Sequence, residues 1–194
     1  MRLLTDLALL LRITGSHGLM RRYFVVNGFD GALTMLGLSM GFYVSNEASI
    51  GVMLTACLGA AVALFMSGVT SAFLSEWEER KRSLAELERA MVADLSESVH
   101  AEAARAVPFV IALVNGLAPL SISVVIITPL ILARAGIDLP LSGLEATIAL
   151  AFIVIFLLGV FLGHVGGGFW LWSGLRTVLI AVATALIVMV VGGI

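Results

Sequence analysis

The chain has 194 residues, of which 60% are hydrophobic and only 12% are charged. A soluble domain is usually roughly 45–50% apolar and about 25% charged, and a globule this small cannot hide so many apolar side chains from water. The composition therefore excludes a water-soluble enzyme, a disordered chain and a free nucleic-acid-binding protein, while the net charge of -2 matters less than where the charges lie.

Residues 1–20 predict an amphipathic helix lying in the membrane interface. Five leucines share one face of this helix, namely Leu3, Leu4, Leu7, Leu10 and Leu11. Asp6 and Arg12 interrupt the apolar segment and no small-residue cleavage site follows, so the segment does not read as a cleavable signal peptide.

Five long stretches nearly free of charge follow, at residues 24–44, 50–75, 107–133, 145–163 and 169–193. Each approaches or exceeds the roughly 20 residues that a helix needs to cross about 30 Å of hydrocarbon, and only helices satisfy their own backbone groups there over such lengths. The predicted fold is all-α: a polytopic membrane protein with five transmembrane helices. We expect one membrane domain over residues 1–194, with a short cytosolic helical insert at 76–105.

The basic residues predict the orientation. Ten of the 11 lie before span one, between spans two and three, or near the start of span five, and Arg134 alone falls on the opposite side. Because cytoplasmic loops are enriched in Lys and Arg, we expect a cytosolic N-terminus and an outer C-terminus. The simplest location is a prokaryotic cytoplasmic membrane.

Span one contains a polar stripe with one carboxylate. Asn27, Asp30, Thr34, Gly37 and Gly41 fall on one side of a helix with 3.6 residues per turn. A buried ionisable residue costs at least about 2.5–3.5 kcal/mol and usually faces protein or water, so Asp30 is a candidate cation or proton site. Pairing of Asp30 with Arg21, Arg22 or a helix end, and plain helix packing at the glycines, are the alternatives.

Spans two and three add further candidate groups to the pathway. Met66 offers a thioether that late first-row metal ions accept more readily than Mg²⁺ does, and Thr70 follows it by one turn. Asn115 lies one turn before Pro119, whose ring frees a backbone carbonyl that a cation could use. Core packing by Met66 and an amide packing bond at Asn115 are the alternatives. We expect Pro108 to mark a helix start.

The insert at 76–105 begins with strong helix formers and no Gly or Pro through Met91, so we expect span two to continue into it. Acidic residues form a stripe on this helix, beside an apolar arc; the stripe contains Glu76, Glu79, Glu86, Asp94 and Glu97. Carboxylate oxygens can gather divalent cations. The alternative is a solvated face neutralised by Arg80, Arg82 and Arg89.

Two segments resemble the vacuolar iron transporter family. Residues 17–33 resemble the family's opening, where a His, an Arg and a Val-x-Gly-x-x-Asp-Gly-Leu pattern introduce span one; here residues 26–31 read VNGFDG, with Ala32 before Leu33. Residues 115–120 (NGLAPL) are similar to the family's Gly-rich, Pro-containing third span. The likeness extends over nearly the whole chain.

The resemblance implies proton-coupled export of cytosolic Fe²⁺ or Mn²⁺ by a homodimer that joins through span one. The metal is the transported substrate, and no organic cofactor is expected. Asp30 would be the membrane carboxylate and Met66 a soft ligand, while Glu76, Glu79 and Glu86 would belong to the metal-collecting region. The expected partners are the lipid bilayer, a divalent metal ion and a second copy, with no nucleic acid.

The chain departs from the family's pattern in span two. The family usually has a glutamate four residues after the methionine, and here residues 66–70 (MSGVT) put Thr70 in that place. The insert is also short. The rival hypotheses are a non-transporting membrane scaffold or sensor whose acidic helix binds a partner, and a transporter of another solute.

Overall fold

The computed structural model describes residues 16–45 and 48–193, and over these ranges the chain is built from helices with no strand. Six helices follow one another: α2 (Ser16–Ser45), α3 (Ile50–Met91), α4 (Val99–Ile126), α5 (Thr128–Arg134), α6 (Gly143–Val165) and α7 (Trp170–Gly192). Most of the predicted helix at residues 1–20 lies outside the described ranges, and residues 16–20 belong to the first turn and a half of α2.

Serine side chains begin three of the helices. Ser49 and Ser98 accept hydrogen bonds from the N–H groups of Val52 and Ala101 at the starts of α3 and α4. Ser142 accepts from the N–H of Glu145, whose carboxylate accepts in return from the Ser142 N–H, which completes a capping box at α6. These caps fix where each helix starts.

Two expectations about helix ends have opposite outcomes. α3 runs unbroken to Met91, so the helix of span two does continue into the insert, but the expected acidic stripe is shorter, because Asp94 and Glu97 lie beyond the end of α3 in the turn before α4. Pro108, by contrast, lies inside α4, and the prediction that it marks a helix start is wrong. The Ser98 cap explains the difference, because it starts the helix upstream and Pro108 is then only an interior proline.

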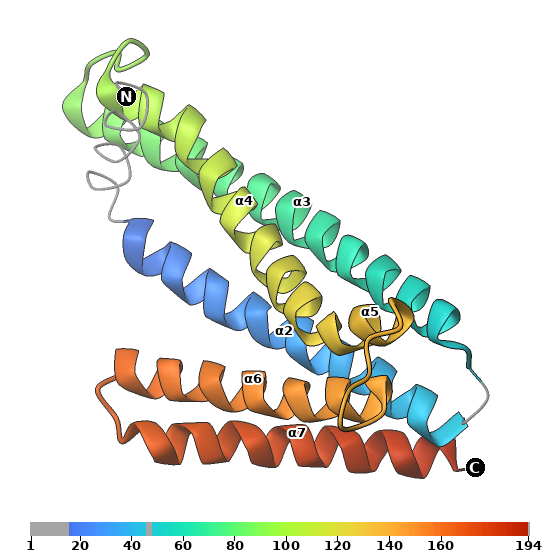
Figure 1. The fold of residues 1–194 in the computed structure, drawn as a ribbon. Coiled ribbons are helices and arrows are strands. Elements are labelled where there is room, and N and C mark those ends of the chain that lie inside the picture. The colour runs from blue at the N-terminus through green and yellow to red at the C-terminus, as the bar shows by residue number, and fades with distance from the viewer. Residues whose placement is uncertain (1–15, 46–47, 194) are drawn as a thin grey trace.

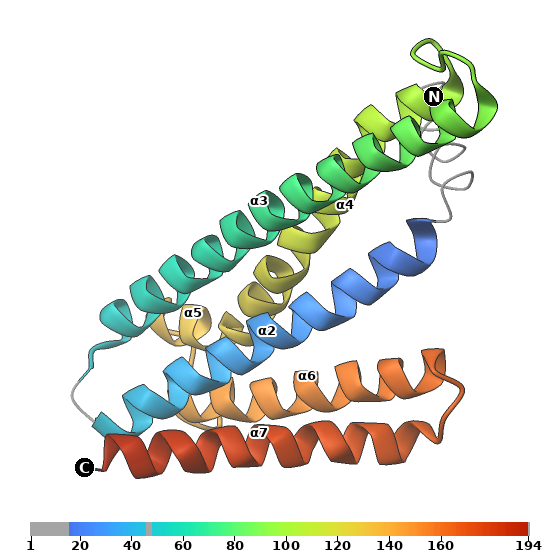
Figure 2. The same ribbon diagram turned by 180° about the vertical axis from the view of Figure 1, so that it is seen from behind.

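The helices form two groups on either side of α2. α3 and α4 pair along their length into a long hairpin, and α6 and α7 form a second hairpin (Figure 1). α2 lies between the two hairpins, packing on α4 on one side and on α6 and α7 on the other, and it contacts α3 much less (Figure 2). The core where these helices meet includes Met35, Leu36, Ile126 and Ile155.

Glycines let some backbones touch directly. A Cβ on Gly31 of α2 would lie 2.7 Å from the carbonyl oxygen of Pro119 in α4, and one on Gly116 of α4 would lie 2.7 Å from the carbonyl oxygen of Phe65 in α3. The absence of a side chain at these two positions therefore sets the distances from α4 to α2 and to α3.

The protein is a helical membrane protein, and four helices of the described ranges are long and apolar enough to cross a bilayer: α3, α4, α6 and α7. α2, which contains the first predicted span, is not among them; its sequence includes the polar Asn27 and Asp30. The predicted count of five is therefore not confirmed, and the fifth span stays a prediction.

Candidate functional site

Asp30 lies on a face of α2 that neither hairpin covers. Its side chain is exposed in the single chain, and it makes no hydrogen bond or ion pair with any residue of the described ranges. Pairing with Arg21 or Arg22, the alternative weighed for this residue, is thus not observed. Thr34 is half-buried beside it, and a Cβ at Gly37 or Gly41 would meet nothing within 4 Å. Asp30, Thr34, Gly37 and Gly41 are called the open stripe below.

Asn27 takes part in a different arrangement from the open stripe, although it is only three residues from Asp30. Its amide nitrogen donates to the Tyr23 carbonyl at 2.9 Å and to the side-chain oxygen of Asn115. Asn115, 5% exposed, donates in turn to the Gly68 carbonyl at 2.7 Å. This amide chain ties α2 to α4 and α4 to α3, so both asparagines already have protein partners.

Met66 and Thr70 both face outward from α3, and Met66 is 54% exposed. No hydrogen bond joins Thr70 to Asp30, Asn27 or Asn115 among the described residues. Because α3 packs mainly on α4 and only slightly on α2, one copy of the chain does not bring these two residues together with Asp30. The packing alternative for Met66 is not observed either, since more than half of the side chain is uncovered.

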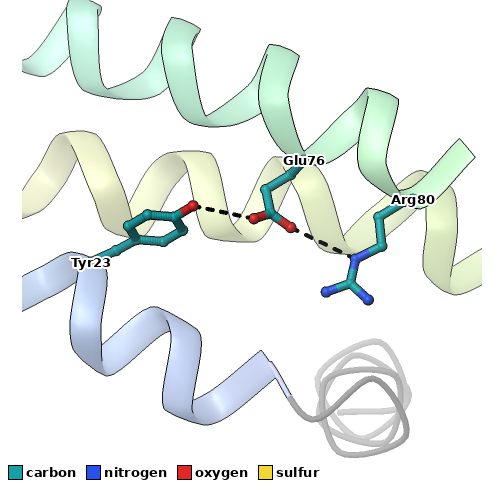
Figure 3. Close-up of polar contacts among 3 residues, drawn as sticks. All are labelled: Tyr23, Glu76 and Arg80. Carbon is teal, nitrogen blue, oxygen red and sulfur yellow. Dashed lines mark hydrogen bonds and ion pairs between the residues drawn. The ribbon is translucent and has the colours of Figure 1, made fainter. Parts of the chain in front are cut away.

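Glu76 is the most buried carboxylate of the described ranges, at 7% exposure. It accepts a hydrogen bond from the Tyr23 hydroxyl at 3.3 Å and forms an ion pair with Arg80 at 3.7 Å. Figure 3 shows the carboxylate between these two side chains, with Tyr23 reaching across from α2. Glu76 thus links the first turns of α2 to the segment of α3 that leads out of the apolar span.

The other two acidic residues expected in the metal-collecting region face solvent, whereas Glu88 is half-buried and accepts a hydrogen bond from the Leu95 N–H. Glu79 is exposed, and Glu86 forms an ion pair with Arg82 at 2.9 Å. The hydrogen bond to Glu86, with the charges of Glu86 and Glu79, raises the pKa of the Arg82 guanidinium above its usual value. These three carboxylates are therefore not brought together in one copy. Glu76 is buried in the contact with Tyr23, Glu79 is exposed, and Glu86 is paired with Arg82.

The described residues contain no group of three or more His, Cys, Asp or Glu side chains that could hold a metal ion. Asp30 and Met66 are separate exposed groups in a single copy. A divalent cation at Asp30 would thus need further ligands from backbone oxygens, from water or from a second copy of the chain.

Sequence reasoning missed two features around these residues. Tyr23 is 53 positions from Glu76 in the chain, so no local sequence pattern predicts their contact. The four-residue spacing of Glu76 and Arg80, by contrast, does predict an ion pair on a helix. The buried hydroxyls of Ser39 and Ser123 have no hydrogen-bond partner among the described residues. The sequence alone does not predict whether a serine in an apolar helix finds such a partner.

Comparison with known proteins identifies one similar protein whose description gives no activity. No protein-family model matches the chain. The chain is 27% identical over 178 residues to the uncharacterized protein MJ0645 of Methanocaldococcus jannaschii, a match that covers 90% of this chain and 88% of that protein. The similarity extends over nearly the full length of both chains.

Proposed function

We propose that this protein exports a divalent transition metal, Fe²⁺ or Mn²⁺, in exchange for protons, as a homodimer joined through the open stripe of α2. In this proposal α2 is a fifth membrane span and the chain is related to the vacuolar iron transporters. The observation that carries it is the exposed, unpaired Asp30 in the middle of a 30-residue helix.

An ionised carboxylate is energetically unfavourable in lipid. An ionised side chain facing lipid near the bilayer centre costs at least about 2.5–3.5 kcal/mol on insertion scales. A second copy packed on the open stripe would remove Asp30 from lipid, and the uncovered Gly37 and Gly41 allow two helices to approach closely.

Two Asp30 carboxylates facing each other would also give a reason to bind metal. Like charges at close range raise each other's cost of ionisation, and either protons or one doubly charged cation relieves that repulsion. The same pair could therefore exchange a metal for protons, with the exposed thioether of Met66 as an added soft ligand and Thr70 lining the route.

The orientation in this proposal follows the basic residues. The N-terminus would be cytosolic and the C-terminus would lie outside a prokaryotic cell membrane. The cytosolic side then carries the turn between α3 and α4 and the exposed carboxylates of Glu79 and Glu86, which would attract cations from the cytosol before they reach Asp30.

The test is metal flux into proteoliposomes that contain the full chain. We expect Asp30→Asn to lower Fe²⁺ and Mn²⁺ flux at least about tenfold, because a neutral amide can neither offset a double positive charge nor exchange a proton. Asp138→Asn, in the exposed loop between α5 and α6, is the matched control and should transport like the wild type. Equal flux through wild type and Asp30→Asn would refute the assignment.

A non-transporting scaffold or sensor is the second candidate function, and one observation favours it: Glu76 and Glu86 are already paired with arginines, in a chain whose described residues hold no metal cluster. The two candidates differ in their response to metal. A transporter should melt at a higher temperature with Fe²⁺ or Mn²⁺ than with Mg²⁺, since ligand binding stabilises the folded state.

That response is measured by thermal unfolding of the purified full chain with each metal chloride added separately. The scaffold hypothesis predicts the same melting temperature with all of them. Asp30→Asn serves as the internal control, because stabilisation that survives this substitution arises from some other site.

A further inference from the structure

The first turns of α2 and the last turns of α6 lie at the same end of the bundle (Figure 1). A surface groove is lined by residues from both. Its volume is about 300 Å³. Its walls are mainly apolar, with Val26 and Phe29 from α2 facing Leu162 and Val165 from α6. Arg21 and Arg22 line the groove at the end where α2 begins.

The two arginines bring positive charge that no carboxylate of the described ranges neutralises. Both are exposed, and neither forms an ion pair with a carboxylate of the described ranges. The Arg22 guanidinium lies 5.9 Å from the centre of the Tyr23 ring, a contact that orients it without cancelling its charge. None of the described residues that line the groove is acidic.

We propose that this groove binds an anionic phospholipid, with the phosphate against Arg21 and Arg22 and an acyl chain along Phe29, Leu162 and Val165. Guanidinium groups bind phosphate through paired hydrogen bonds, and basic pockets between membrane helices are a recurring site for acidic headgroups. The arginines lie at one end of the groove and the apolar walls extend from them along the helices. A lipid has the same arrangement, with a charged headgroup followed by an apolar acyl chain.

The combination of groups favours a lipid over a soluble anion. A free phosphate would use the two arginines and leave the apolar walls exposed, whereas a lipid fills both parts of the groove. A zwitterionic lipid would fit the walls but would place its own cation near the arginines. This proposal depends on the protein being embedded in a membrane, and it holds or fails independently of metal transport.

The test is native mass spectrometry of the full chain in detergent with phosphatidylglycerol or phosphatidylcholine of matched chain length. We expect the wild type to retain phosphatidylglycerol in preference to phosphatidylcholine. Each arginine near an acidic headgroup contributes about 1 kcal/mol, so R21Q should weaken phosphatidylglycerol binding about fivefold and R21Q/R22Q about thirtyfold. Leu162→Ser should weaken binding of both lipids.

The matched control is R89Q/R134Q, which removes two exposed arginines outside the groove and should bind as the wild type does. R21Q alone keeps the test valid if the double variant folds poorly, because Arg22 also contacts Tyr23. Equal retention of phosphatidylglycerol by wild type and R21Q would overturn the proposal and leave the groove to a protein segment. Displacement of the lipid by excess inorganic phosphate would overturn it in favour of a soluble anion.

Discussion

Gly31→Ala should lower the free energy of unfolding by about 1–3 kcal/mol relative to Gly37→Ala. The new Cβ at position 31 would lie 2.7 Å from the carbonyl oxygen and 2.9 Å from the Cα of Pro119, whereas at position 37 it would meet nothing within 4 Å. Backbone atoms of a packed helix cannot move aside as a flexible side chain can. α2 and α4 would therefore have to separate in the Gly31→Ala protein.

The difference in unfolding free energy between Gly31→Ala and Gly37→Ala isolates the effect of the steric clash. Each substitution gains about 1 kcal/mol of helix propensity over glycine, so that gain cancels in the difference. The measurement is unfolding of each purified variant in the same detergent. Equal stability of the two variants would mean that α2 and α4 are not in backbone contact at Gly31.

Gly37 also provides a second readout. In a single copy a Cβ at Gly37 would meet nothing within 4 Å, so we expect Gly37→Leu to retain the fold. If two copies join through the open stripe, the larger side chain should separate them. Loss of self-association with unchanged secondary structure would support the dimer, and an unchanged oligomeric state would argue against it.

The sequence was sufficient to predict the helical membrane character of the fold, because hydrophobic length is a local property. Packing between helices depends on residues far apart in the sequence, so the contacts of individual side chains could not be predicted. The stripe from Asp30 to Gly41 was identified from helical periodicity, yet the same periodicity placed Asn27 on it. In the structure Asn27 bonds to Asn115, 88 positions away. A helical wheel gives the angle of a side chain without showing which neighbour stands opposite.

The acidic helix illustrates the same limit. Glu76, Glu79 and Glu86 share an arc of α3, so periodicity alone treats them as equivalent. Tyr23 of α2 approaches only the first of them, and Glu76 is consequently buried while Glu79 and Glu86 remain exposed. This difference in exposure arises from the approach of α2 to α3 at this end of the bundle. Such an approach cannot be predicted from a short segment of sequence.

Glu76→Ala should destabilise the fold by about 1.5–3 kcal/mol, the range for hydrogen bonds to a charged group. The substitution leaves the Tyr23 hydroxyl without its acceptor and removes the carboxylate that pairs with Arg80. Glu76→Gln should lose less, because its side-chain oxygen can still accept from Tyr23. Glu79→Ala, an exposed neighbour on the same helix, should change the unfolding free energy by no more than about 0.5 kcal/mol.

This series also decides whether Glu76 is a metal-collecting residue or a link between α2 and α3. A link predicts that Glu76→Ala unfolds more easily without any metal present. It also predicts that Tyr23→Phe, which removes the hydrogen bond but keeps the ion pair with Arg80, loses less than Glu76→Ala does, about 1.5 kcal/mol. A metal ligand predicts the reverse pattern: metal-free stability equal to the wild type, with the stabilisation by Fe²⁺ or Mn²⁺ abolished. The buried position of the carboxylate between a tyrosine and an arginine (Figure 3) favours the first pattern, since each of its two oxygens already has a protein partner.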